Sequence, residues 1–204
     1  EAKGGPESGV ISAAQKWVAP DSSVPLTSVQ TLRVHQRAAS ERMFDFTVTL
    51  TAGEKDVILG DTKEGTFAMR IAESMRLKTP KGAPAGTGRI LNSEGVRDAK
   101  VWGQAAKWVD MYGPIGGKTY GIAIFDHPKN LRHPTRWHAR DYGLFAANPF
   151  CGKEMDPSLP AGSADYTLKA SQSLTLQYRV FIHEGDANAT ALEERFREFA
   201  AQSK

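Results

Sequence analysis

The residues best suited to chemistry lie in one stretch, Tyr120–Phe150. Within it Arg136, His138, Arg140 and Tyr142 occupy alternate positions. Successive side chains of a strand point to opposite faces of its sheet. The spacing therefore predicts two guanidinium groups, an imidazole and a phenol on one face of a sheet.

This row of side chains suits a sugar that bears a carboxylate, because the planar fork of arginine binds a carboxylate through two hydrogen bonds. We expect His138 to act as the catalytic acid or base, with Glu64 and Asp126 as its carboxylate partners. Arg70 lies in a predicted strand, Glu64–Ala72, and is expected beside the site. A solvated sheet face with ordinary ion pairs would give the same pattern, so the structure has to decide between the two.

The turn before this row supplies three further candidates for ligand binding, His127, Asn130 and His133. Three imidazoles, with His138 as the third, are a known zinc arrangement, but spacings of six and five residues do not make them converge. We therefore predict no metal and no cofactor. The chain also has no phosphate loop, no Gly-x-Ser-x-Gly and no His-Glu-x-x-His, so common nucleotide-dependent and hydrolase classes are not indicated.

Composition indicates a globular protein, and the row of polar side chains described above makes a small molecule or an oligosaccharide its expected partner. The chain has 204 residues, 40% hydrophobic and 24% charged, enough for one core, and we expect a single domain over residues 1–204. No run of eighteen apolar residues occurs, which argues against a membrane partner. The net charge of +3 is spread along the chain, which argues against nucleic acid. The single cysteine excludes an internal disulfide.

Hydrophobic patterning predicts an all-β fold. In Met43–Leu50 apolar side chains alternate with polar ones, as in a half-buried strand. Thr190 and Glu193 fit a capping box at the start of a C-terminal helix. We predict an antiparallel two-sheet sandwich, mutarotase-like or jelly-roll-like, with this one helix on an end or outer face. A long loop is expected at Thr79–Ala99, and Trp137, Ala139 and Leu144 are expected to face the core. Further strands are expected at Val10–Val18, Leu26–His35, Asp56–Leu59, Val101–Met111, Tyr166–Ala170 and Leu174–Ile182.

Two long motifs carry a resemblance to a known family. They are YGIAIFDHPKNLRHPTRWHARDYGLFAANPF and the upstream GDTKEGTFAMRIAE, and with them the chain resembles the bacterial PmoA-like family from about Gly9 to Ala200. Members of this family of unknown function look longer at the amino end, which implies that the chain is a fragment whose missing strands come from a second chain or subunit. Members also resemble exported proteins of polysaccharide-degrading bacteria. The resemblance implies a periplasmic or secreted enzyme of glycan metabolism, a lyase, epimerase or hydrolase, or else a non-catalytic carbohydrate-binding module.

Overall fold

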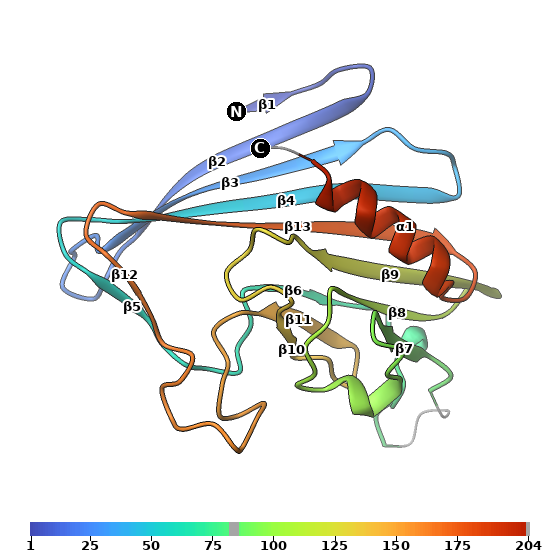
Figure 1. Cartoon of the computed structure of the whole chain (residues 1–204). Coiled ribbons are helices and arrows are strands. Elements are labelled where there is room, and N and C mark those ends of the chain that lie inside the picture. The colour runs from blue at the N-terminus through green and yellow to red at the C-terminus, as the bar shows by residue number, and fades with distance from the viewer. Residues whose placement is uncertain (82–85, 203–204) are drawn as a thin grey trace.

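The computed structural model describes residues 1–81 and 86–202, and its described strands form three antiparallel sheets (Figure 1). The large sheet has eight strands in the order β1-β2-β3-β4-β13-β9-β8-β7, and the smaller ones have the orders β10-β11-β6 and β12-β5. The strands are β1 (Ala2–Lys3), β2 (Ser8–Trp17), β3 (Leu26–His35), β4 (Glu41–Ala52), β5 (Val57–Leu59), β6 (Phe67–Arg70), β7 (Arg89–Asn92), β8 (Trp108–Ile115), β9 (Lys118–Asp126), β10 (Arg136–Trp137), β11 (Leu144–Asn148), β12 (Tyr166–Leu168) and β13 (Ser173–Glu184). The predicted all-β antiparallel architecture is confirmed.

Alternation along β4 divides the large sheet into an inner and an outer face. Val48 and Leu50 enter the main core with the partly buried Phe44 and Phe46, while Asp45 lies on the opposite face beside Met43. On the neighbouring strand β13 the same parity sends Leu176, Tyr178 and Val180 into the main core. The two-residue alternation of apolar and polar side chains in the sequence therefore matches the alternation of side chains between the two faces of the sheet.

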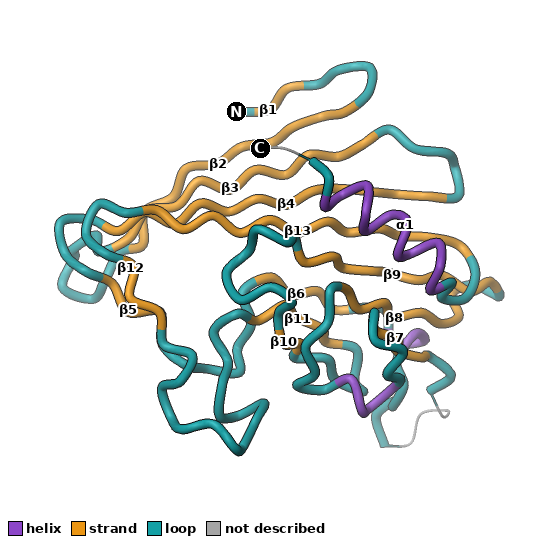
Figure 2. The backbone as a smooth tube through the Cα atoms, in the orientation of Figure 1, coloured by secondary structure: helices purple, strands orange, loops and turns teal. Residues whose placement is uncertain are grey.

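The inner face packs against the three-stranded sheet. Trp137, Ala139, Phe145 and Ala147 of that sheet and its extension join the main core. The outer face is covered by the helix α1 (Ala189–Ala200), whose Leu192, Phe196 and Phe199 are buried against it. Figure 2 shows α1 lying along one side of the large sheet, with the small sheets and their loops on the other. The helix thus packs on an outer face, as expected from the sequence.

Several predicted elements differ from those in the structure. Val101–Met111 does not form a strand throughout, because a short 3-10 helix (Asp98–Val101) and a turn precede β8. The long loop predicted at Thr79–Ala99 contains β7, and its residues 82–85 lie outside the described residues. A second 3-10 helix spans Glu73–Met75.

The cap of α1 also differs from the prediction. The N-cap is Asn188, whose side chain accepts a hydrogen bond from the backbone N–H of Ala191. Glu193 does not take part in a capping box. Its carboxylate instead accepts hydrogen bonds from Lys107 (2.8 Å) and from the indole of Trp108 (3.2 Å). These partners lie more than eighty residues away in the chain, so a local pattern could not predict them. Within the described residues, no helix is long and apolar enough to cross a bilayer.

Candidate functional site

The candidate site lies on the face of the three-stranded sheet that points away from the core. β10 is short, but its pairing with β11 continues: the backbone N–H of His138 donates to Ala146 at 2.9 Å, and that of Arg140 donates to Leu144 at 2.7 Å. Alternation along this pair sends Trp137 into the core and His138 to the opposite side. The predicted alternation, which places Arg136, His138 and Arg140 on one face of the sheet, is therefore observed as far as Arg140.

An open pocket of about 450 Å³ occupies one end of this face. Five residues predicted for the site meet there, drawn from two separate segments of the chain, residues 64–70 and 138–142. They come together because β6 pairs with β11 in a register that sets Arg70 opposite Leu144. The lining residues are Lys63, Glu64, Arg70, Trp102, His138, Arg140, Tyr142, Leu144 and Glu154.

His138 is the most enclosed polar group of the pocket. The residue is only 4% exposed, and its Nδ1 has no hydrogen-bond partner within the described residues. Burial and then the charge of Arg140 lower its pKa, against the opposing charge of Glu64 and a hydrogen bond to the backbone of Lys63. The imidazole is therefore neutral at neutral pH and can accept a proton.

Two guanidinium groups lie close to the ring of Tyr142. The Cζ of Arg70 lies 5.7 Å from the ring centre, and that of Arg140 lies 5.5 Å from it. Arg140 also lies 5.8 Å from the ring of Trp102, which itself meets the His138 ring edge-on at 6.1 Å. Neither arginine forms an ion pair with a carboxylate in the described ranges. Their positive charge is thus available to an anion in the pocket.

Arg136 belongs to the same sheet face but not to this pocket. Its guanidinium donates to the backbone carbonyl of Gly103 at 2.9 Å and pairs with Asp156 at 2.8 Å. It lines a separate pocket together with Asn148, its partner in the β10–β11 register. The expectation that Arg136 and His138 line one pocket is therefore wrong. Strand parity fixes the face of a side chain, but it does not fix which end of the face the side chain lines.

Asp126, expected as an acid or base, is instead the centre of a buried network. Its carboxylate accepts hydrogen bonds from Asn130 (2.7 Å) and from the backbone of Thr135 (3.1 Å), and contacts Nδ1 of His133 at 2.7 Å. Asn130 also bonds to both backbone polar groups of Gln177 on β13. These contacts fix the 127–135 loop to the large sheet. Asp126 and Asn130 are buried and do not line the pocket of His138.

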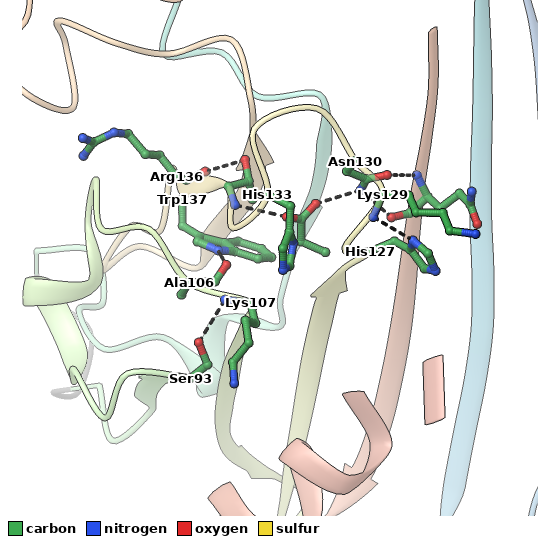
Figure 3. A network of polar contacts seen from close by, with 12 residues as sticks. Ser93, Ala106, Lys107, His127, Lys129, Asn130, His133, Arg136 and Trp137 are labelled. Atoms are coloured by element: carbon green, nitrogen blue, oxygen red, sulfur yellow. Dashed lines mark hydrogen bonds and ion pairs between the residues drawn. The ribbon is translucent and has the colours of Figure 1, made fainter. Parts of the chain in front are cut away.

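The other two histidines of the loop lie against α1. The ring of His133 stacks on Phe196 at 6.1 Å, and His127 meets Phe199 edge-on at 4.9 Å. Burial, followed by the nearby charge of Lys129, lowers the pKa of His127. Figure 3 shows His127, Asn130 and His133 grouped in the loop, with the side chain of Arg136 extending away from them. The predicted contacts of these three residues with the ligand of His138 are not supported by this geometry.

The three histidines therefore do not converge, and no cluster of three potential metal ligands occurs among the described residues. Trp137 is 0% exposed, and its indole N–H donates to the backbone carbonyl of Ala106 at 2.9 Å. Trp137 and Ala139 face the core as predicted. Leu144 was predicted to face it too, but it lines the pocket, because its β11 parity is opposite to that of Phe145.

Sequence patterns gave no indication that Lys63 and Glu154 belong to the pocket. They form an exposed ion pair at 3.5 Å that joins two loops above the sheet face. The two residues are 91 positions apart and lie in irregular segments, where no periodicity reveals a contact.

A second buried polar pair, Asp110 and His183, was also missed. Nε2 of His183 lies 3.3 Å from the carboxylate of Asp110, and the pair bridges β8 and β13 across β9. Gly121 on β9 makes room for it, because a Cβ there would lie 2.2 Å from Nε2. His183 lines a small pocket of about 210 Å³ beside the start of α1.

Comparison with known proteins places the chain in a family but gives it no activity. No curated protein matches the chain. The match to a family covers almost the whole chain and its description carries no function, so the PmoA-like name stays a resemblance. The chain belongs to DUF6807, a family of unknown function, whose model matches residues 1–197.

Proposed function

We propose that this chain is a carbohydrate-active enzyme that removes a proton next to the carboxylate of an acidic sugar residue. The proposal rests on one observation: His138, a buried imidazole whose Nδ1 has no hydrogen-bond partner among the described residues, lines a pocket that also holds Arg70 and Arg140 without carboxylate partners in that part of the chain. A neutral base next to available cations suits the formation of a negatively charged intermediate.

The chemistry assigns a role to each group. His138 takes the proton from the carbon next to the carboxylate, and the electron pair moves into the carboxylate to give an enediolate. Arg70 and Arg140 stabilise the added charge. Return of a proton to the opposite face gives an epimer. Expulsion of the glycosidic oxygen from the adjacent carbon, with a proton from Tyr142 or Glu64, gives the unsaturated product of a lyase.

Proton abstraction fits the pocket better than hydrolysis does. A glycosidase needs two carboxylates across the scissile bond, one to protonate the leaving group and one to attack or activate water. Glu64 and Glu154 both line the pocket, but Glu154 is paired with Lys63. Glu64 is then the one carboxylate of this pocket without an ion-pair partner, and a carboxylate pair is not available.

The test is to incubate the protein with galacturonate and mannuronate polymers in deuterated water. Lyase activity gives ultraviolet absorbance from the unsaturated product, and epimerisation gives deuterium in the recovered sugar. We expect His138→Gln to lower either rate by about 10²-fold or more. His35→Gln, on β3 and outside the pocket, is the matched control.

Two outcomes would contradict the enzymatic proposal. Binding of these polymers by the wild type without deuterium exchange or cleavage would identify a non-catalytic carbohydrate-binding module instead. A His138→Gln variant that folds normally and keeps the wild-type rate would remove His138 from the chemistry.

A further inference from the structure

The pocket of His138 shares its sheet face with another pocket. The second, of about 300 Å³, is lined on the sheet by Ala105, Arg136 and Asn148. These three form a row across the sheet, because Ala105 pairs with Arg136 and Arg136 pairs with Asn148. The remaining lining residues are Arg132, Pro134, Pro149, Cys151, Gly152, Leu159, Ser163 and Ala164.

The distance between the pockets follows from the strand. Leu144 lines the first pocket and Asn148 the second, and they stand at opposite ends of β11. Four residues of strand span about 13 Å. Such a span is longer than one sugar ring, so a monosaccharide would fill one pocket and leave the other empty.

A bridge formed by two loops, one holding Gly65 and the other Met155, lies between the pockets. Gly65 packs on Ala146, where a Cβ would lie 2.5 Å from the Ala146 methyl, and Gly103 packs on Met155, whose backbone oxygen would lie 2.9 Å from such a Cβ. The exposed Lys63–Glu154 ion pair joins the two loops. Exposed ion pairs of this kind contribute little stability. The bridge therefore presents two solvated charges and does not form a rigid barrier between the pockets.

Positive charge is present at both ends of the face. Arg70 and Arg140 line the first pocket. In the second, the partners of Arg132 among the described residues are the backbone carbonyls of Pro149, Ala164 and Asp165, so its charge is not paired with a carboxylate there. Arg136 adds a second guanidinium, which forms an ion pair with Asp156. This pattern matches a linear polyanion that carries its carboxylates at intervals.

We infer that the second pocket is a further subsite, and that the substrate is a linear oligosaccharide of acidic sugars that crosses the bridge and occupies both pockets. This inference rests on the proposed function, because it takes the first pocket as the reactive one. His138 then lies where the chain of sugars crosses from one pocket to the other, so the enzyme acts within a polymer rather than on a free monosaccharide.

The experiment measures dissociation constants for galacturonate and mannuronate oligomers, from the monomer to the hexamer, by calorimetry. We expect the hexamer of the preferred series to bind at least tenfold more tightly than its monomer. Leu159→Glu, which adds a negative charge to the second pocket, should weaken hexamer binding about tenfold and leave monomer binding unchanged. Ala161→Glu adds the same charge at an exposed position of the same loop, outside the pocket lining, and should change neither.

The outcomes separate the two proposals. Equal affinity for monomer and hexamer would overturn the subsite while leaving the first pocket as a binding site. Equal loss of monomer and hexamer binding in Leu159→Glu would likewise overturn it. Failure of both series to bind the wild type at any length would overturn the proposed function and the subsite together.

Discussion

At the scale of single residues, Trp137 and His138 are chain neighbours on opposite faces of one sheet. Trp137 fills the main core, and His138 lines the pocket. We expect Trp137→Ala to lower the free energy of unfolding by about 3–5 kcal/mol, the usual cost of truncating a buried aromatic side chain. Urea denaturation followed by circular dichroism measures this loss.

His138→Ala is the matched variant for this prediction. It removes a side chain whose Nδ1 makes no hydrogen bond in the described structure, so its loss of stability should be clearly smaller. Similar losses in the two variants would show that the two side chains do not divide between core and pocket as the structure has them.

At the scale of elements, the start of α1 depends on Asn188. Because its side-chain oxygen accepts the N–H of Ala191, Asn188→Ala should cost about 1 kcal/mol in the free energy of unfolding. Thr190→Ala, at the position that the sequence pattern favoured for the cap, should change it by no more than about 0.5 kcal/mol. A larger loss from Thr190→Ala than from Asn188→Ala would contradict the observed cap.

Local patterns were sufficient where burial alternates along one strand. The polarity of β4 and the parity of His138 and Arg140 could be predicted because each depends only on neighbouring residues. Asp126 could not be assigned, since a carboxylate after a strand looks the same whether it is catalytic or, as here, bonded to Asn130 and Thr135. The Asp110–His183 pair joins residues 73 positions apart, and no pattern in the sequence reveals such a contact.

At the scale of the whole molecule, apolar side chains remain exposed on the first strands of the large sheet. Ile11 is 54% exposed, Trp17 50% and Val34 46%. Replacing Ile11 and Val34 together by Thr should therefore change the free energy of unfolding by no more than about 1 kcal/mol, while reducing binding of a hydrophobic dye. A loss of several kcal/mol would show that these side chains are buried in solution. The expected second chain that supplies strands stays a prediction.

The stability of the whole fold should also depend on pH through the Asp110–His183 pair, because the pair ties β8 to β13 beneath the start of α1. Burial opposes protonation of His183, but the hydrogen bond and charge of Asp110, with smaller contributions from the Glu184 backbone and Glu41, raise its pKa overall. Burial raises the pKa of Asp110 as well, against the contact with His183. Both directions mean that the folded pair holds its proton more tightly than the unfolded chain does.

A raised folded pKa contributes stability that is complete below the unfolded value, about 6.5 for histidine, and is lost as pH rises through the folded value. The charged groups around His183 are Asp110 on β8, Glu41 on β4, Glu184 on β13, and Asp186 and Arg195 beside the pocket.

His127 and His138 have lowered pKa values and act in the opposite direction, so the informative quantity is the difference between wild type and variant. We expect the stability advantage of wild type over His183→Gln, measured by urea denaturation, to be largest below about pH 6 and to shrink as pH rises above about 6.5. A constant or growing advantage over that range would show that His183 is not the protonated partner of Asp110.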